Sequence, residues 1–422
     1  MKILIINLHS SQNAGDDVLT KVTVQQLRAS FVSPRLTLAM NDPDSYIGED
    51  VVLGSFATWL KSPRGRWRVE GILWLLLSFV VVLLYRLTKK HLLFIIPDEK
   101  RPLLQAYFDA DLVISSAGNF LYSSGRIGVP FLLAIYTMAY AILSGKPLYT
   151  MPQTIGPLRK RRERWLVKRI IGKMRLLFVR DAISQAGLEV MGAWHRHCHL
   201  VPDIAFALAS SPNTQGAQLL QENGVTISSR PLLGVTLINW GAQNRLFTTQ
   251  HAYETAVSEA IRFFLNEYDG HAILFSQVTG PSIMDDDRIP AQRVKQLLAD
   301  VEAKVTFIDG TPTPETLKSA YGQMDIFIGS RLHSNIFALS EIVPAIMIQY
   351  QPKTRGVVQM LGLDSWVIEI ENVTAISLIE MTQKLWRERY DIRQRLEEIM
   401  PAIIEQASSA ADKIAVDATR LL

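Results

Sequence analysis

Ser330, Arg331 and His333 stand between an apolar, strand-like run at 324–328 and a helical pattern at 335–341. A strand that turns through glycine into a serine-capped helix leaves unpaired N–H groups facing outward, and such a helix end attracts anions. Arg331 adds a permanent bidentate cation, and His333 adds a group that exchanges protons near neutral pH. The motif predicts a site that holds a phosphate or carboxylate and moves a proton beside it. The alternative is a capped core helix whose arginine makes a structural ion pair.

Polar side chains also follow other predicted strands. Asp16 lies in the loop after the first strand, and two carboxylates at a helix start disfavour phosphate there, so we interpret Asp16 as a hydroxyl acceptor or simply a helix cap. Tyr350 and Lys353 follow the strand pattern at 345–348, where Lys353 could join Arg331 around an anion. The remaining candidates for substrate contact, each after a strand pattern, are Asn119, Gln153, Arg180 and Gln277. For Arg180 a structural ion pair is the alternative.

No metal site is predicted. The three carboxylates at 285–287 suggest one at first sight, but neighbours on a loop or helix do not point at one centre, and no histidine is near. The alternating histidines at 195, 197 and 199 lack a fourth ligand at known zinc spacing.

The elements that must position these residues alternate between strand and helix along most of the chain. This pattern predicts right-handed crossovers and a mainly parallel sheet in an α/β fold. We expect two doubly wound, Rossmann-like domains, one at 1–205 with an apolar insertion at 61–96, and one at 231–385. Residues 206–230 read as a linker region and 386–422 as helices. Such domains usually face each other across a cleft, with ligands at the carboxyl ends of the strands.

Length and composition narrow the class of protein. The 422 residues exceed what one hydrophobic core usually supports. The net charge is +4, and the basic clusters at 61–68 and 159–169 lack aromatic interleaving, which argues against nucleic-acid binding. The single cysteine, Cys198, excludes an intrachain disulfide and fits a reducing compartment. Because 1–8 reads as a buried strand rather than a signal peptide, we expect a cytoplasmic protein.

The segment 71–85 is almost entirely apolar and is flanked by basic residues. As a helix, these 15 residues would reach about 22 Å, short of the ~30 Å hydrocarbon core of a bilayer. If 1–8 and 111–115 are strands of one sheet, a single crossing between them would also put them on opposite sides of a membrane. The segment is therefore a re-entrant or interfacial helix that contacts a membrane surface, or a buried or dimer-forming one.

The ordered set of motifs resembles the polysaccharide pyruvyl transferase family, and most closely its exopolysaccharide and colanic acid branch. The motifs that carry the resemblance are Asn13-Ala14-Gly15-Asp16, Pro152-Gln153-Thr154-Ile155-Gly156-Pro157, Val179-Arg180-Asp181 with Ser184, Val201-Pro202-Asp203, Ile328-Gly329-Ser330-Arg331-Leu332-His333, and Tyr350-Gln351-Pro352-Lys353-Thr354-Arg355-Gly356. The arginine–leucine–histidine motif and the tyrosine–lysine pair, at this spacing, are its most specific part.

The resemblance implies a fold like that of GT-B glycosyltransferases, with phosphoenolpyruvate as donor and no other cofactor. The acceptor would be a sugar of an exopolysaccharide repeat, as an oligosaccharide or lipid-linked saccharide, and the product a pyruvate ketal. Arg331 and His333 would correspond to donor-contacting residues. From the donor's chemistry we expect Arg331, Lys353 and the helix start to hold phosphate and carboxylate, His333 to deliver a proton or contact phosphate, and Asp16 to take the sugar hydroxyl proton.

Two departures from the family pattern stand out. The loop after 111–115 is less rich in glycine than in many members, and the strand-end segment 234–240 lacks an arginine that many members carry. Another residue must therefore supply that positive charge, or the donor site is altered. The rival functions are a GT-B glycosyltransferase that uses a nucleotide sugar, and a non-catalytic component of a polysaccharide assembly complex.

Overall fold

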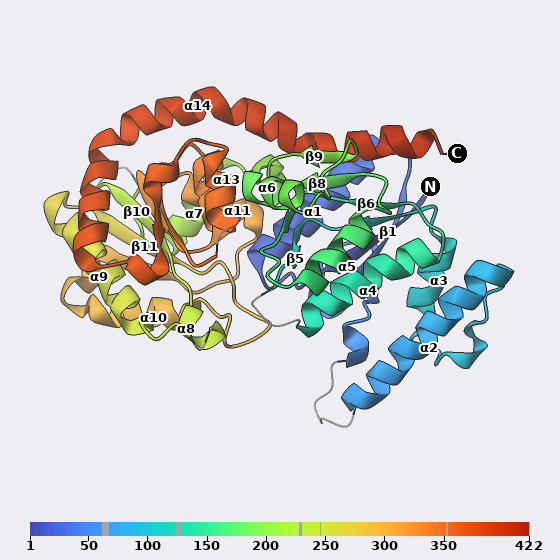
Figure 1. Ribbon diagram of the computed structural model, residues 1–422. Coiled ribbons are helices and arrows are strands. Elements are labelled where there is room, and N and C mark those ends of the chain that lie inside the picture. Colours follow the sequence, from blue (N-terminus) through green and yellow to red (C-terminus); the bar gives the residue numbers. More distant parts are fainter. Residues whose placement is uncertain (61–66, 124–127, 228–229, 245, 352, 422) are drawn as a thin grey trace. The chain divides into compact units, whose positions relative to one another are not determined.

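The computed structural model describes residues 1–60, 67–123, 128–227, 230–244, 246–351 and 353–421 (Figure 1). The chain divides into two compact units. Unit 1 contains Met1–Ser11, Leu19–Ile204 and Gln406–Leu422, and unit 2 contains Gln12–Val18 and Ala205–Glu405. The short segment Gln12–Val18, which carries Asp16, therefore belongs to the second unit.

Unit 1 is built on parallel strands with helices between them. Its strands are β1 (Lys2–Leu8), β2 (Arg35–Met40), β3 (Val51–Gly54), β4 (Leu112–Ser115), β5 (Gly118–Leu121), β6 (Leu148–Thr150), β7 (Gln153–Ile155), β8 (Leu177–Val179) and β9 (Cys198–Leu200). Its helices are most of α1 (Ala14–Ser30), then α2 (Trp67–Thr88), α3 (Arg101–Asp109), α4 (Val129–Leu143), α5 (Arg161–Ile171) and α6 (Ala182–Val190). The sheets run in the orders β3-β2-β1-β4-β6 and β5-β7-β8-β9. Six of the seven residues of β1 are buried, as expected for a parallel strand covered on both faces.

Unit 2 has one six-stranded parallel sheet in the order β12-β11-β10-β13-β14-β15. Its strands are β10 (Leu232–Thr236), β11 (His271–Phe275), β12 (Val305–Ile308), β13 (Ile326–Gly329), β14 (Ala345–Gln349) and β15 (Val367–Glu369). This order places the topological switch point between β10 and β13, where ligands bind in open α/β sheets, beyond the carboxyl ends of the strands. Gly329 and the residues after it stand at that point.

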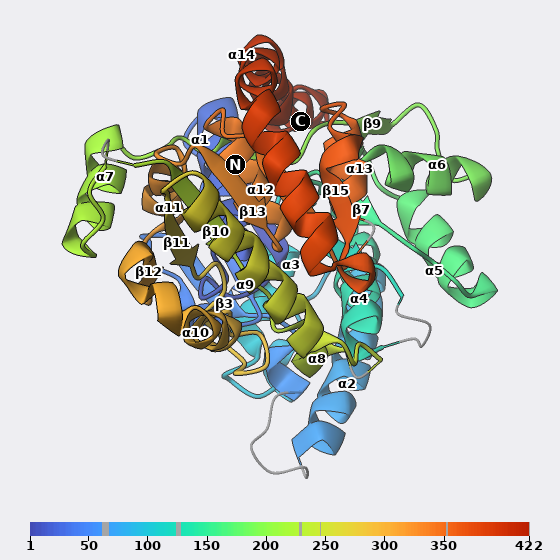
Figure 2. The ribbon, with the colours of Figure 1, turned by 90° about the vertical axis from the view of Figure 1, so that its left-hand side faces the viewer.

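The helices of unit 2 are α7 (Asn213–Glu222), α8 (Trp240–Gln243), α9 (Gln250–Glu267), α10 (Arg288–Leu297), α11 (Pro314–Tyr321), α12 (Leu332–Ser340), α13 (Lys353–Gln359) and the greater part of α14 (Ala375–Thr419). Helices α9 and α14 lie side by side (Figure 2), where Trp386 of α14 packs on Phe264 and Tyr268. This packing makes the first part of α14 a component of unit 2.

The structure differs from the expected organisation in three places. The expected linker at 206–230 contains α7, whose Gly216 packs on the backbone of Ser319 in unit 2. The expected C-terminal helices at 386–422 belong to one helix, α14, that begins at Ala375. Strands β2, β3, β5, β7 and β15 were not anticipated, because each has only three to six residues and β2 is rich in Leu, Ala and Met, which fit helices as well.

Our expectation that the apolar segment is too short to span a bilayer was wrong. Helix α2 has 22 residues, about 33 Å, and Val69–Thr88 is long and apolar enough to cross a membrane by length and composition alone. The topological objection holds, however. Strand β1 pairs with β4, so strands before and after α2 belong to one sheet and cannot lie on opposite sides of a bilayer.

Candidate functional site

The turn from β13 into α12 sits at the switch point of the unit 2 sheet. A Cβ on Gly329 would lie 1.8 Å from the Asn335 side-chain oxygen, so glycine is required for this close approach. The expectation of a serine cap was wrong, because Arg331 is the N-cap residue and makes no side-chain cap bond. The Ser330 hydroxyl is instead hydrogen bonded to the Tyr253 hydroxyl at 2.6 Å, both being buried. A substrate role for Ser330 would therefore require that bond to break.

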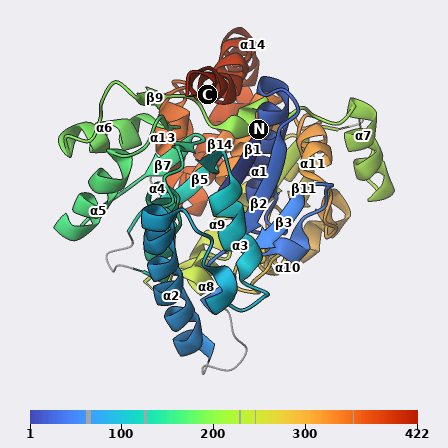
Figure 3. The same cartoon turned by 90° about the vertical axis from the view of Figure 1, so that its right-hand side faces the viewer.

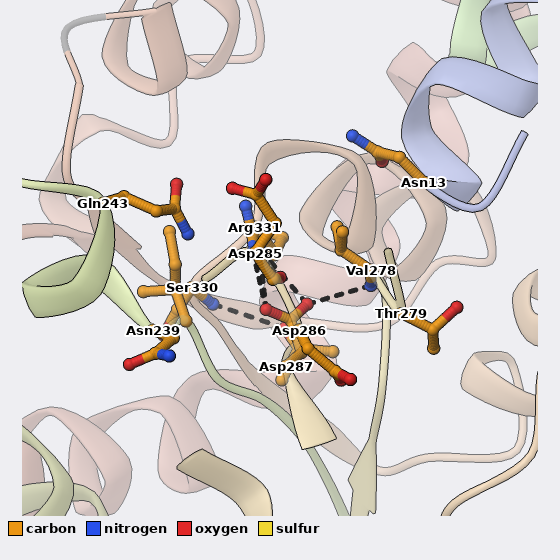
Figure 4. A network of polar contacts seen from close by, with 12 residues as sticks. Asn13, Asn239, Gln243, Val278, Thr279, Asp285, Asp286, Asp287, Ser330 and Arg331 are labelled. Atoms are coloured by element: carbon orange, nitrogen blue, oxygen red, sulfur yellow. Dashed lines mark hydrogen bonds and ion pairs between the residues drawn. The ribbon is translucent and has the colours of Figure 1, made fainter. Parts of the chain in front are cut away.

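Arg331 is held by a carboxylate that lies 44 residues earlier in the chain. Its Nη2 donates to Asp287 Oδ1 at 2.6 Å and its Nε to the same carboxylate at 3.1 Å. A further bond from Nη2 reaches the Asp285 carbonyl at 3.0 Å. Asp287 is fully buried and also accepts the Val278 N–H at 3.0 Å, so it connects Arg331 to the loop after β11 (Figure 4). The structural ion pair that the sequence left open is present.

This ion pair changes what Arg331 can offer to a ligand. Burial opposes the charged form, but Asp287 and a bond with Tyr350 outweigh it, and the pKa of Arg331 is raised above its ordinary value. The guanidinium is thus permanently charged, yet Asp287 balances that charge. Arg331 can act as an oriented hydrogen-bond donor, while additional positive charge for a highly charged anion must come from other groups.

The segment that carries Asp16 is fastened onto unit 2 by backbone contacts. The Ala14 N–H donates to the Gln277 carbonyl and the Thr279 N–H to the Gln12 carbonyl, both at 3.1 Å. A Cβ on Gly15 would lie 2.1 Å from Nδ1 of His333. Glycine at this position therefore allows the start of α1 to press directly against the histidine, and Asp16 follows it immediately.

The predicted catalytic residues Asp16, Arg331 and His333 are accordingly brought together in unit 2. Asp285 joins them, because its backbone carbonyl contacts Arg331 and its carboxylate feels the charges of both Arg331 and Asp16. Burial and the nearby Asp16 raise the pKa of Asp285, although Arg331 opposes the shift. The Asp16 carboxylate itself accepts a bond from the Asn13 amide at 3.0 Å. This group contains two carboxylates, an imidazole and a guanidinium, which suffice for proton transfer beside an oriented donor.

Three further candidates lie in or next to this part of unit 2. Gln277 is buried and its Oε1 accepts the Tyr321 hydroxyl at 2.9 Å, while its backbone carbonyl holds the 12–16 segment. The Tyr350 ring packs against Trp240 with centroids 4.7 Å apart, and its hydroxyl bonds to Arg331. Lys353 begins helix α13, but its side chain lies outside the described part of the structure.

The remaining candidates belong to unit 1. Arg180 is 1% exposed and pairs with Asp203 at 2.6 Å, while its Nε donates to the Thr154 hydroxyl at 2.9 Å. This burial corrects the expectation of a substrate contact, since the guanidinium has no surface to present. Gln153 is also fully buried and donates to the Ser115 hydroxyl and the Ser116 carbonyl.

Asn119 differs from these two unit 1 residues because it lies in the short strand β5 and is only half-buried. As a residue Asn119 is the most exposed of the unit 1 candidates, although its side-chain oxygen is buried.

The three consecutive carboxylates are divided between two arginines. Asp286 pairs with Arg288 at 2.7 Å, Asp287 pairs with Arg331, and Asp285 lies beside Arg331. Within the described residues, no group of three or more His, Cys, Asp or Glu side chains is gathered in a way that could hold a metal ion.

The sequence did not reveal the importance of Asp285 and Asp287, which were considered only as metal ligands. Their run of charge was visible, but its pairing with Arg331 depends on the tertiary fold. Arg293 was missed as well. Its Nη2 lies 3.3 Å from Oδ1 of Asn239, in the segment after β10, and it pairs with Glu254 at 2.6 Å. A guanidinium thus reaches the strand end where the expected arginine is absent.

Comparisons with known proteins agree with this architecture. Residues 13–352 match the family model described as polysaccharide pyruvyl transferase. The chain is 22% identical over 424 residues to the amylovoran biosynthesis protein AmsJ of Erwinia amylovora, with 99% of each chain covered.

Solved structures share the fold at low identity. The UDP-GlcNAc 2-epimerase of Neisseria meningitidis superposes with a TM-score of 0.61 at 13% identity, and Anabaena HepE in complex with UDP-glucose with a TM-score of 0.55 at 12% identity. Both comparisons cover 100% of each chain. The two-domain α/β fold of the GT-B type is thereby confirmed.

Proposed function

Because the chain belongs to the polysaccharide pyruvyl transferase family, we propose that it transfers the enolpyruvyl unit of phosphoenolpyruvate to two hydroxyls of an exopolysaccharide sugar. The product is a pyruvate ketal, and inorganic phosphate is released. The similarity to an amylovoran biosynthesis protein supports an exopolysaccharide acceptor, as an oligosaccharide or a lipid-linked saccharide. The observation that carries the proposal is the close approach of Gly15, the residue before Asp16, to the His333 imidazole at the switch point of the unit 2 sheet.

The reaction needs one proton donor and one acceptor. Protonation of the methylene carbon of phosphoenolpyruvate leaves positive charge at C2, and a sugar hydroxyl attacks C2 as its proton passes to a base. The C2–O bond to phosphate then breaks, and a second hydroxyl closes the ketal on C2. The two hydroxyl protons balance the one gained by the methyl group and the one carried by the departing hydrogen phosphate. No oxidant or reductant is consumed.

Residues of unit 2 can fill these roles. We assign the proton delivery to His333 and the removal of the sugar hydroxyl proton to Asp16. Asp285, whose pKa is raised by burial and by Asp16, is a second group able to carry a proton to the donor. Arg331 orients an oxygen of the donor with the guanidinium edge that faces away from Asp287.

The proposed reaction requires positive charge around phosphoenolpyruvate, and the acidic residues of the site oppose it. Asp16, Asp285 and Asp287 together outweigh the single charge of Arg331, and phosphoenolpyruvate is itself an anion. We assign the missing positive charge to Lys353, to protonated His333 and to the N-terminal end of α12. Lys353→Met should therefore raise the KM for phosphoenolpyruvate more than it lowers kcat.

The proposal is tested by incubating the full chain with phosphoenolpyruvate and an oligosaccharide isolated from the cognate polymer. We expect phosphate release and a ketal mass increment on the oligosaccharide. His333→Ala should abolish both, while His251→Ala, a change in the exposed first turn of α9, should leave both unchanged. Consumption of a UDP- or GDP-sugar without phosphate release from phosphoenolpyruvate would instead identify a glycosyltransferase. Polymer that remains pyruvylated in cells carrying His333→Ala would indicate a non-catalytic role.

A further inference from the structure

Helix α2 of unit 1 has two faces that differ in burial although both are apolar. Its inner face contains Gly71, Ser78, Val82 and Tyr85, all of which are buried. The inner face packs on α4, because the Ser78 hydroxyl lies 2.7 Å from the Tyr136 hydroxyl and Arg86 donates to carbonyls at the end of α4. These contacts fix which side of α2 is turned away from unit 1 (Figure 3).

The outer face is an unbroken apolar stripe. Its exposed residues are Val69 (64%), Ile72 (51%), Leu73 (60%), Leu76 (61%), Phe79 (40%), Val80 (47%), Leu83 (38%) and Leu87 (81%). No charged or polar side chain lies between 71 and 77 or between 79 and 84. A soluble protein rarely leaves so long an apolar stripe in water unless the stripe meets a partner.

The charges around the stripe are predominantly basic. From residue 61 to residue 97 the only acidic side chain is Glu70, whereas the basic residues there are Lys61, Arg64, Arg66, Arg68, Arg86, Lys89 and Lys90. Lys89 and Lys90 directly follow the helix and are exposed. Basic residues therefore precede and follow an apolar face, an arrangement that suits the boundary between acyl chains and anionic head groups.

We propose that the outer face of α2 docks onto the surface of a bilayer that contains anionic lipids, with the helix axis in the membrane plane. The pairing of β1 with β4 rules out a crossing at α2, so contact of this helix with a bilayer must be made from one side. A second copy of the chain fits this face less well. In either a parallel or an antiparallel pairing of two α2 helices, the basic ends of one copy would meet the basic ends of the other.

This docking would also serve the function proposed above. That benefit, access to a lipid-linked acceptor, rests on the proposed function. A chain held at the bilayer surface by α2 meets a lipid-linked saccharide without diffusing through solution. The docking itself does not depend on that acceptor, because it follows from the burial and charge of α2 alone.

Flotation of the full chain with phospholipid vesicles tests the proposal. We expect binding to vesicles with about one third phosphatidylglycerol, and much weaker binding to pure phosphatidylcholine or in high salt. Leu76→Glu combined with Val80→Glu should reduce the partition coefficient at least a hundredfold, since two apolar side chains leave the acyl boundary. The matched control is Val190→Glu combined with Val416→Glu, two exposed helical valines elsewhere in unit 1, which should bind as the unchanged chain does.

A second variant guards against a folding defect. Lys89→Ala combined with Lys90→Ala leaves the apolar stripe intact and should weaken binding to anionic vesicles roughly fivefold per lysine. Failure of the unchanged chain to float with anionic vesicles would overturn the proposal. So would a Leu76→Glu, Val80→Glu variant that retains its fold by circular dichroism and still binds vesicles fully. A third outcome would assign the face to a second copy of the chain instead. In that outcome the unchanged chain does not bind vesicles but is a dimer by light scattering, and the Leu76→Glu, Val80→Glu variant loses the dimer.

Discussion

Asp287→Asn is expected to destabilise unit 2 strongly, because it removes one half of a buried ion pair. The carboxylate is fully buried and accepts Nε and Nη2 of Arg331 together with the Val278 N–H. Asparagine keeps the size and one acceptor, but it leaves a guanidinium, on a side chain only 10% exposed, without an opposite charge. Breaking a buried pair from one side typically costs about 3–5 kcal/mol. We expect a loss of this size in the free energy of unfolding.

The matched control is an exposed pair in the same unit. Arg262 and Asp300 lie 2.9 Å apart, but their side chains are 25% and 60% exposed. Asp300→Asn should therefore cost less than about 1 kcal/mol. Urea denaturation of the full chain measures both, with tryptophan fluorescence and circular dichroism followed together, because a chain of two units need not unfold in one step.

The double substitution of the buried pair separates stability from chemistry. Asp287→Leu combined with Arg331→Met removes both charges and should recover much of the lost stability. The double variant should still abolish phosphate release from phosphoenolpyruvate, since the Arg331 guanidinium that would orient it is gone. If Asp287→Asn unfolds at the same urea concentration as Asp300→Asn, the buried pair does not support unit 2 and this reasoning is refuted.

Three further predictions follow from other contacts. Gly15→Ala places a Cβ 2.1 Å from Nδ1 of His333 and should lower kcat about a hundredfold, because the imidazole is displaced. The melting temperature should fall only slightly, and an unchanged rate of phosphate release would contradict this prediction. Burial lowers the pKa of His271 below its usual value, so the folded state favours the neutral imidazole. The stabilising contribution of His271 is therefore complete above about pH 6.5, the pKa in the unfolded chain, and is lost as the pH falls through the lower folded pKa. His271→Gln should flatten the decline of the melting temperature between about pH 7 and pH 5. Arg180→Met should cost about 3–5 kcal/mol, which Asp203→Leu in the same chain should largely restore in thermal unfolding.

The architecture could be predicted because each buried parallel strand can be recognised in the sequence as a short apolar run. Strands such as β1 and β13 are buried on both faces and read as short apolar runs that end at glycine or polar residues. The alternation of such runs with helical patterns specifies right-handed crossovers and places loops at the carboxyl ends of strands. The sequence alone therefore places Ser330, Arg331 and His333 at a strand end.

The partners of these residues could not be predicted in the same way. Arg331 pairs with Asp287, and Gly15 presses on His333 from the opposite end of the chain. No local pattern distinguishes Asp287 from Asp286, which pairs with Arg288, or from Asp285, which contacts Arg331 through its backbone carbonyl. Arginine at a strand end is equally consistent with an anion site and with an ion pair, and only the fold decides between them.

The length of α2 shows a related limit. Hydropathy marks 71–85, yet the helix extends from Trp67 to Thr88, because Arg, Glu and Leu at its ends are good helix formers. A helix ends where its backbone bonds and propensities fail, whereas an apolar segment ends at the first charge. The length of the helix, rather than that of the apolar run, therefore decides whether α2 is long enough to span a bilayer.

The motifs of this family divide into two groups with different physical roles. Arg180 and Asp203 form a buried pair in unit 1, so substitutions there should act on stability. Asp16, Arg331 and His333 lie at the switch point of unit 2, where a ligand can be oriented. A motif residue is thus a candidate for chemistry when its polar atoms lie at a strand end and are not all paired with a buried partner. Arg331 lies between the two groups, since Asp287 holds it in place while the function proposed above assigns its remaining edge to the substrate.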